Sequence, residues 1–343
     1  MSYAAELGYC LLLLLGLCNE QGQKQFCMLA VMNGVISLGK KYSVLKFKRQ
    51  LPLFFMVLPA LIFVSVFAYS PLYGWGMAFF RYKPGQDIYS GKPLGFQMFE
   101  DFFFDMSGSW YVLRNTLGIN ILIIVVNLSL AIFLAILINE MKLKYVKKTV
   151  QTITFFPFFI SWVITYTVFT VFFSASNGMV NEVLQFFGII DEGIDFLGDP
   201  KWAWFIVVVA SAWKSTGYNS VIFLSAIAGI DAELYEAAQI DGASRLRRIW
   251  SITLPNLMPT LTILLIMNAG WILSSNFEQF FLFSNMSNQT GMEVFDTYIY
   301  RYGLKMLNFS YATAVGIMKS FASITLLILA NTFSKFVTKR GIM

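Results

Sequence analysis

A short, regularly spaced group of residues in the C-terminal third of the chain has the pattern of a protein-docking element. Positions 236–238 read Glu-Ala-Ala, and Gly242 follows after three further residues. Asp231 is a suitable N-cap for a helix through this segment, Ser244 can cap the next helix, and glycine readily takes the left-handed conformation that ends a helix. Small alanine side chains let another protein surface approach the backbone closely. The pattern therefore predicts a short partner-binding helix in a loop over about 231–255.

Catalytic and metal-binding side chains are scarce. The chain has no histidine, which removes histidine acid–base catalysis, the serine–histidine–aspartate triad and histidine metal sites. The three cysteines all lie in the first 27 residues and lack the spacing of a zinc site. We therefore predict no catalytic residue, no metal site and no cofactor bound by this chain.

One segment partly matches the sequence motif of a nucleotide-binding loop. Residues 34–41 match a phosphate loop until the last position, where Lys41 replaces the serine or threonine that would hold Mg²⁺. No acidic partner strand follows, and the segment abuts an apolar run. We interpret the match as coincidence, so ATP hydrolysis linked to this chain must come from another polypeptide.

Polar side chains within apolar segments are the candidates for a solute path. A charge at membrane depth is costly and usually faces a cavity. Lys214 lies about midway along one apolar segment, although a lysine that snorkels or pairs structurally explains it equally well. We predict a translocation path lined by Lys214, Asn219, Asn276 and Glu278. The two amides can alternatively bridge helices.

The elements that must position these residues are membrane-spanning helices. Hydrophobic residues make up 57% of the chain and charged residues 13%, which is the balance of a membrane protein. A spanning helix needs about 20 apolar residues. Six segments meet this need, at roughly 52–70, 116–138, 149–173, 202–227, 257–273 and 312–336. The expected fold class is an all-α integral membrane protein, in which Pro255 breaks the chain before the fifth span.

Basic residues set the expected orientation of these spans. Every second connection is rich in lysine or arginine, and the docking loop and the C-terminal tail are two of these basic regions. The remaining connections are acidic or mixed. Because cytoplasmic loops carry the excess of basic residues, both termini and the docking loop are expected in the cytoplasm. The net charge of +6 follows this membrane pattern, so no nucleic-acid partner is expected.

The first 50 residues are of uncertain character. Their apolar run over 7–17 is too short for a normal span, and a signal-like segment, an interfacial helix or a weak extra span all explain it. A start codon assigned too far upstream is a further explanation. We divide the chain into an N-terminal segment, 1–50, and a membrane domain, 51–343.

The docking pattern resembles the EAA loop of ABC-importer permeases, the cytoplasmic element that docks onto an ATPase subunit. Residues 234–243 are similar to the carbohydrate-importer (MalF- and MalG-like) permeases at nearly every position. Four further segments resemble the LplB-type branch, at 71–74, 213–217, 296–303 and 309–316. The resemblance extends from about Leu51 to the C-terminus. It implies a six-helix transmembrane domain of a type I ABC importer with a cytoplasmic EAA coupling helix.

The same resemblance implies partners and a function. The ATPase contacts would be Glu236, Ala237, Ala238, Asp241 and Gly242. The partners would be a second homologous permease, a cytoplasmic ATPase dimer that holds ATP and Mg²⁺, an extracytoplasmic sugar-binding protein and membrane lipid. The implied function is oligosaccharide import by alternating access in a bacterial plasma membrane, with this chain as a transport subunit rather than an enzyme.

Two alternative functions remain at this point. One is a permease for another solute, such as a charged sugar or glycerol phosphate, in which the docking loop is kept and only the cavity differs. The other is an ATP-independent secondary transporter, although the two halves of the chain show no repeat that would support it.

Overall fold

The computed structural model describes residues 51, 54–104 and 109–338, and these residues are almost entirely helical. The predictions for the segment 1–50 lie outside this range. The chain divides into two compact units, residues 1–73 and 74–343. The described residues contain no β-strand, only an isolated bridge between Phe80 and Pro93. The expectation of an all-α protein is therefore confirmed.

The helices follow one another with short connections. A helix begins at Phe54 in the first unit and continues through the π turn η1 (Ser65–Tyr69) into η2 (Ser70–Phe79), whose last six residues belong to the second unit. The helices that follow are η3 (Ile88–Ser90), α3 (Gln97–Phe104), α4 (Ser109–Glu140), α5 (Lys144–Phe155), η4 (Phe156–Phe159), α6 (Trp162–Phe173), α7 (Met179–Phe186), α8 (Ala203–Ala228), α9 (Ala232–Ile240), α10 (Arg245–Arg248), η5 (Ile249–Thr253), α11 (Leu254–Gly270), α12 (Phe277–Phe283), α13 (Gln289–Met292), α14 (Phe295–Tyr300), η6 (Arg301–Lys305) and α15 (Phe309–Thr338).

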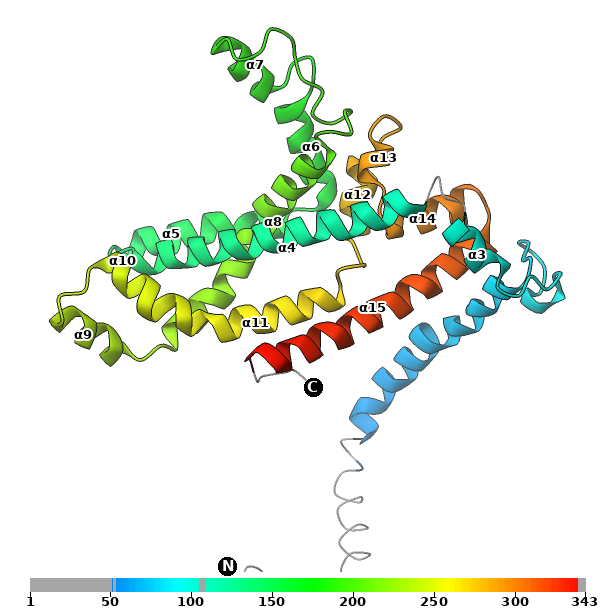
Figure 1. Ribbon diagram of the computed structural model, residues 1–343, viewed down its shortest axis with the longest axis horizontal. Helices are drawn as coiled ribbons and strands as arrows, with labels where there is room; N and C mark the ends of the chain where they lie inside the picture. The colour runs from blue at the N-terminus through cyan, green and yellow to red at the C-terminus, as the bar shows by residue number, and fades with distance from the viewer. Residues whose placement is uncertain (1–50, 52–53, 105–108, 339–343) are drawn as a thin grey trace, which may run out of the picture. The chain divides into compact units, whose positions relative to one another are not determined.

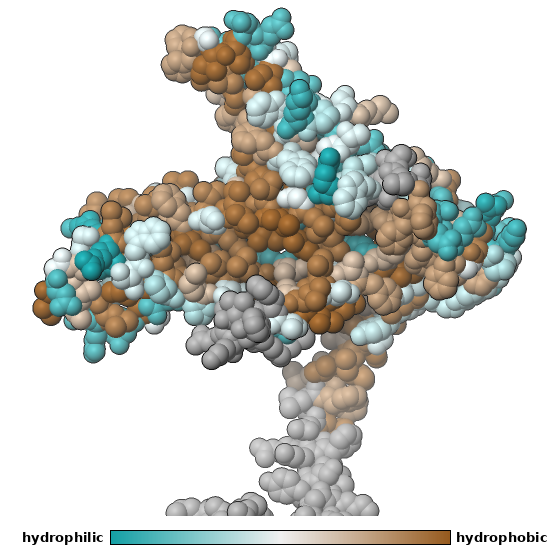
Figure 2. Space-filling view, in the orientation of Figure 1, coloured by the Kyte–Doolittle hydropathy of each residue, from teal (hydrophilic) through white to brown (hydrophobic). Residues whose placement is uncertain are grey.

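Long helices packed side by side form the body of the second unit. Helix α4 packs along α8, and α11 packs along α15, while α9 and α10 lie at one end and α13 and α14 lie towards the other (Figure 1). Apolar side chains cover the surface over α4, α5 and α11, and polar side chains gather at the end formed by α9 and α10 (Figure 2). This distribution is the one expected when a lipid bilayer surrounds the middle of a helical bundle.

Most of the predicted spans correspond to single helices. Among the described residues, the helices long and apolar enough to cross a membrane are Phe54–Phe79, Trp110–Glu140, Arg245–Gly270 and Phe309–Thr332. The bent pair Lys144–Phe159 and Trp162–Phe173 adds a fifth if it forms one span. The remaining predicted span, 202–227, is helix α8. Its 26 residues extend about 39 Å, which is long enough, but the polar side chains around Lys214 interrupt its apolar sequence, so it is not among the helices apolar enough over a membrane-spanning stretch.

The prediction of one continuous helix over 149–173 is wrong. Helices α5 and α6 meet at an angle of 105°. Between them the chain passes through η4, where Pro157 lacks an amide hydrogen, and then through the extended residues Ile160 and Ser161. The Ser161 side chain accepts a hydrogen bond from the amide of Ile164 and so begins α6 as a new helix.

The prediction that Pro255 breaks the chain is also wrong. The helix runs continuously from Arg245 to Gly270, so the fifth span begins earlier than expected and ends three residues before Leu273. Pro255 lies in the first turn of α11, directly after the π turn η5. A π turn widens the helix and shifts its hydrogen bonds, which accommodates a proline ring that a regular helix would exclude.

Helices α5 and α8 touch backbone to backbone at Gly217. A Cβ atom placed on Gly217 would lie 1.9 Å from the carbonyl oxygen of Thr154, far inside van der Waals contact. Beside this point the ring of Tyr218 stacks on Phe158, with ring centroids 4.2 Å apart. The absence of a side chain at Gly217 therefore sets how closely the broken span approaches α8.

Replacing Gly217 with alanine is expected to push α5 away from α8 and to cost about 1–3 kcal/mol of stability. The cost arises because a backbone atom, which cannot rotate away, occupies the position of the new methyl group. Thermal unfolding of the purified chain in detergent measures it. Gly229→Ala, at the end of the same helix, is the control because its nearest neighbouring atoms are 3.5 and 3.8 Å away. Equal losses for the two variants would contradict this account of the packing.

Candidate functional site

The predicted docking segment folds through local caps. The Asp231 side chain accepts a hydrogen bond from the amide of Glu233 at 3.0 Å and begins α9. Gly242 follows the helix with a φ angle of 75°, in the left-handed region. The Ser244 side chain then accepts a hydrogen bond from the amide of Arg247 at 3.4 Å and begins α10. The structure therefore confirms both predicted caps and the predicted conformation of Gly242.

Helix α9 presents nearly all of its surface to the outside. Of the predicted ATPase contacts, Ala238 is partly buried, and the others are exposed. Large apolar side chains beside them are exposed as well, with Ile240 at 87% and Trp250 at 70%. Tyr235 ties the helix to the rest of the unit through a 2.9 Å hydrogen bond with the hydroxyl of Thr253. A helix held in place yet uncovered in this way is suited to docking against another protein.

Lys214 occupies the break between α5 and α6. Its side chain is buried, and its Nζ donates to the carbonyl oxygens of Pro157 at 3.4 Å, Phe158 at 3.1 Å and Ile160. The ammonium also lies 5.3 Å from the centre of the Trp162 ring. The Pro157 carbonyl also accepts a hydrogen bond from the amide of Ile160, whereas the described residues offer no amide to the carbonyls of Phe158 and Ile160. The ammonium therefore supplies the donor that the interrupted helix lacks, which is the structural alternative considered for this residue.

The other predicted path residues lie on α8 and at α12. Glu278 is exposed in the first turn of α12. Asn276 caps the same helix and accepts a hydrogen bond from the amide of Gln279 at 3.2 Å. Asn219 is partly exposed farther along α8. The structure shows no hydrogen bond or ion pair among these four residues within the part of the chain it describes, and their role in a solute path stays a prediction.

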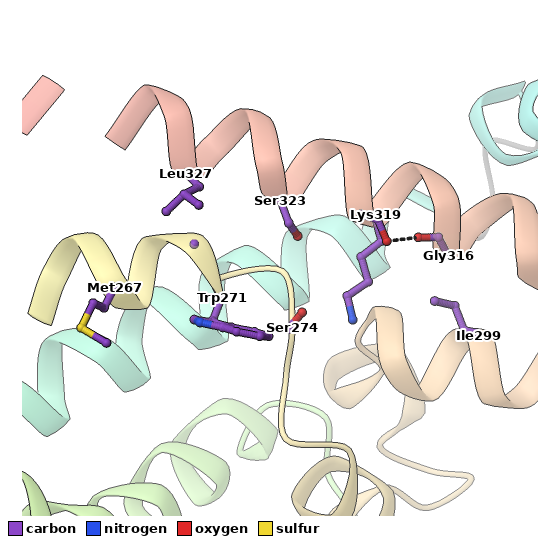
Figure 3. Close-up of a pocket in the computed structure, with 10 residues that line it drawn as sticks. Met267, Trp271, Ser274, Ile299, Gly316, Lys319, Ser323 and Leu327 are labelled. Atoms are coloured by element: carbon purple, nitrogen blue, oxygen red, sulfur yellow. Dashed lines mark hydrogen bonds between the residues drawn. The ribbon is translucent and has the colours of Figure 1, made fainter. Parts of the chain in front are cut away.

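A cavity of about 550 Å³ opens between α11, α14 and α15 (Figure 3). It is lined by Met267, Gly270, Trp271, Ser274, Ile299, Gly316, Lys319, Ser320, Ser323 and Leu327. Three serine hydroxyls and one exposed indole face make this lining suitable for a polar ligand with apolar ring faces. The hydroxyl oxygen of Ser323 is buried without a hydrogen-bond partner among the described residues.

This cavity was not part of the predicted path. Its serines and its tryptophan carry no charge, and such residues are ordinary within apolar segments. Lys319, an ionisable residue in the last predicted span, is the signal in the sequence that points to it. In the structure the Lys319 ammonium donates to Asp296 at 2.6 Å, so its charge is compensated within the chain.

Comparison with known proteins supplies the observation that decides the family. Residues 128–341 match the model of the binding-protein-dependent transport system inner membrane component. This chain belongs to that family. The match includes α9 and its caps, the Lys214 region and the cavity between α11 and α15.

Individual relatives resemble the permease over most of its length. Protein LplB of Bacillus subtilis (strain 168) is 36% identical over 90% of this chain and 96% of its own. The polygalacturonan/rhamnogalacturonan transport system permease protein YteP of the same organism is 37% identical over 88% of this chain and 94% of its own. These relatives confirm the resemblance recognised in the sequence and the interpretation as a multi-pass membrane transport subunit.

A solved structure shows the same fold. It is a bacterial alginate ABC transporter in complex with a periplasmic protein bound to an alginate pentasaccharide. The permease superposes on one of its chains with a TM-score of 0.78 and 36% identity, covering 87% of this chain and 98% of that chain. The expected transmembrane fold of a type I importer is thereby confirmed.

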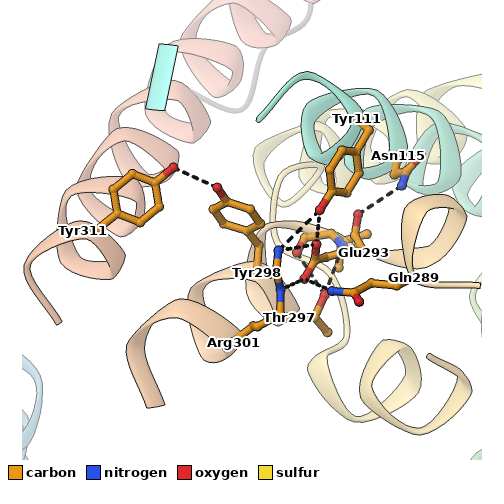
Figure 4. Close-up of polar contacts among 9 residues, drawn as sticks. Tyr111, Asn115, Gln289, Glu293, Thr297, Tyr298, Arg301 and Tyr311 are labelled. Carbon is orange, nitrogen blue, oxygen red and sulfur yellow. Dashed lines mark hydrogen bonds and ion pairs between the residues drawn. The ribbon is translucent and has the colours of Figure 1, made fainter. Parts of the chain in front are cut away.

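A buried ion pair joins Glu293 and Arg301 beside Tyr111 of α4 (Figure 4). The Glu293 carboxylate is 2% exposed and accepts hydrogen bonds from the Arg301 guanidinium at 2.6 and 2.9 Å, from Gln289 and from the hydroxyl of Tyr111. Burial alone would lower the pKa of Arg301, but Glu293 outweighs it, and the pKa lies above its ordinary value. The cluster fastens α13 and α14 to the start of α4.

Proposed function

We propose that this permease is one membrane subunit of an ATP-driven oligosaccharide importer of the bacterial plasma membrane. The observation that carries the proposal is α9, a capped and exposed helix at the end of the second unit where polar side chains gather. The sugar-importer relatives support the choice of solute. Both termini and α9 lie in the cytoplasm in this proposal, in line with the distribution of basic residues.

The proposed assembly contains three further kinds of subunit. A second homologous permease completes the path, a cytoplasmic ATPase dimer binds ATP and Mg²⁺, and an extracytoplasmic binding protein delivers the sugar. The ATPase contacts are Glu236, Ala237, Ala238, Asp241 and Gly242. Closure of the ATPase dimer moves α9 and shifts the permeases between inward-facing and outward-facing states. This shift requires that the docking contacts differ in free energy between the two states.

The membrane domain contains hydrogen-bonding and aromatic side chains of the kinds that bind the hydroxyl groups and ring faces of an oligosaccharide. Asn219, Asn276 and Glu278 line the proposed path, and Lys214 acts beside them by holding the break between α5 and α6 in place. The cavity next to Trp271 adds an indole face for a sugar ring and serine hydroxyls for its hydroxyl groups. A charged sugar is the second candidate for the solute. One relative is a polygalacturonan/rhamnogalacturonan transport system permease, and a matched structure is that of a transporter involved in the import of the acidic polysaccharide alginate.

The first experiment is affinity purification of the permease from gently solubilised native membranes, followed by mass spectrometry. We expect one ATPase and a second permease to copurify, and the reconstituted complex to take up oligosaccharide only with ATP and the binding protein. A permease that purifies alone and transports solute without ATP would overturn the proposal.

A further inference from the structure

A second cavity, of about 720 Å³, lies at the end of α8 that is farthest from α9. It is lined by Tyr111 and Arg114 of α4, by Pro200 and Lys201 just before α8, by Trp204 in the first turn of α8, and by Thr290 and Gly291 of α13. Because α8 is 26 residues long, about 39 Å of helix separates this cavity from the connection to α9. If α9 docks on the cytoplasmic side, the cavity therefore opens on the side where the solute arrives.

The cavity carries two positive charges without a balancing carboxylate side chain. Arg114 and Lys201 are both exposed, and among the residues that the structure describes neither forms an ion pair with an acid. Glu293, the nearby buried acid, is taken by Arg301. Asp199 accepts a hydrogen bond from the backbone amide of Lys201 rather than from its ammonium. The site is therefore suited to an anionic group supplied from outside the chain.

The arginine is held in position by a buried amide. Both Nε and Nη2 of Arg114 donate to the side-chain oxygen of Asn115, at 3.3 and 3.1 Å. Asn115 is fully buried, and its own amide nitrogen donates to the carbonyl oxygens of Thr290 and Glu293. An exposed guanidinium oriented in this way has already lost part of its conformational entropy, which favours ligand binding.

A rigid aromatic wall stands beside the two charges. The indole nitrogen of Trp204 donates to the carbonyl oxygen of Gly291 at 3.0 Å. The same ring packs on the backbone of α4 at Gly118, where a Cβ atom would lie 2.3 Å from it. The hydroxyl of Tyr111 donates to Glu293. A flat, fixed ring is the surface on which the apolar face of a sugar stacks.

We infer that this cavity is an entry site for an acidic oligosaccharide, in which a uronate ring lies against Trp204 while its carboxylate binds Arg114 and Lys201. The inference rests on the proposed function and deepens it by naming the class of sugar. The combination of cations with an aromatic wall favours a uronate over a simple inorganic anion, which needs no ring surface. The volume lies within the range of about 300–1,000 Å³ typical of small-molecule sites, whereas a protein docking face needs no such cavity.

The test measures binding of trigalacturonate and of its methyl ester to the full transporter complex in nanodiscs, without the binding protein. We compare the native complex with the double variant Arg114→Gln/Lys201→Gln. The charged trisaccharide is expected to bind about tenfold more weakly to the double variant, from about threefold for each exposed charge. The neutral ester is expected to bind both proteins alike. Lys83→Gln, which removes an exposed charge outside this cavity, is the matched control and should change neither affinity.

Three results would overturn the inference. The first is equal affinity of the acid and its ester for the native complex, and the second is an unchanged affinity of the acid for the double variant. The third is a double variant that binds the extracytoplasmic binding protein more weakly but binds the charged trisaccharide normally, which would assign the cavity to protein docking. In each case the native complex would still take up oligosaccharide with ATP and the binding protein, so the proposed function would stand. Absence of ATP-dependent uptake of any sugar would instead refute the proposed function.

Discussion

Replacing Gly242 with aspartate is expected to leave the permease folded in the membrane while lowering ATP-driven uptake about tenfold, a coupling loss of about 1.4 kcal/mol. Gly242 has a φ angle of 75°, and apart from its two chain neighbours no atom of the described residues lies within 4 Å of the position of a new Cβ. The permease itself therefore has room for the side chain, at a backbone cost of about 1–2 kcal/mol. In the proposed assembly the main effect therefore arises at the ATPase, because the added carboxylate would occupy space that the partner surface needs.

The ratio of sugar imported to ATP hydrolysed in proteoliposomes measures this effect. Gly188→Asp is the matched control, because Gly188 has a φ angle of 64° with equally open surroundings but lies just after α7, away from the docking segment. The control carries the same backbone strain and should keep the native ratio. Full uptake by Gly242→Asp, or an equal loss in both variants, would remove α9 from the coupling mechanism.

The second large effect is expected at Lys214. Methionine has a similar length but no charge and no donor, so Lys214→Met leaves the carbonyl oxygens of Phe158 and Ile160 without the ammonium that satisfies them. The Pro157 carbonyl also loses the ammonium but keeps its hydrogen bond from the amide of Ile160. An unsatisfied buried acceptor costs about 1–3 kcal/mol. Because the three carbonyls sit at the break between α5 and α6, we expect the variant to lose stability and to change the angle between these helices.

Thermal unfolding in detergent, together with the distance between spin labels on α5 and α6, tests this prediction. Lys201→Met removes an exposed lysine next to the same helix and should not alter either measurement. Lys214→Arg, which keeps the charge and several donors, should recover part of the lost stability. If Lys214→Met unfolds at the native temperature and also transports normally, Lys214 neither holds the break nor belongs to the path.

The features that could be predicted from the sequence depend on neighbouring residues or on composition. The caps at Asp231 and Ser244 and the left-handed Gly242 involve groups no more than three residues apart, so local chemistry decides them. The length and apolarity of the spans reflect the thickness of the bilayer, which acts on every segment separately. The helix that carries the EAA spacing belongs to this group too, because its nine residues fold next to their own cap at Asp231.

The remaining features depend on groups that meet only when the helices pack. The break after α5 requires Lys214, which comes from another helix, and the continuous helix through Pro255 requires a π turn that no residue pattern indicates. The buried cluster around Glu293 and the two cavities likewise combine side chains from several elements. A polar side chain in an apolar segment indicates that a hydrogen-bond or charge partner lies nearby in the folded protein, because burying the group without one is costly. The packing of helices that are distant in the sequence decides which group becomes that partner. For this reason the polar contacts inside the membrane domain could be identified only from the tertiary structure.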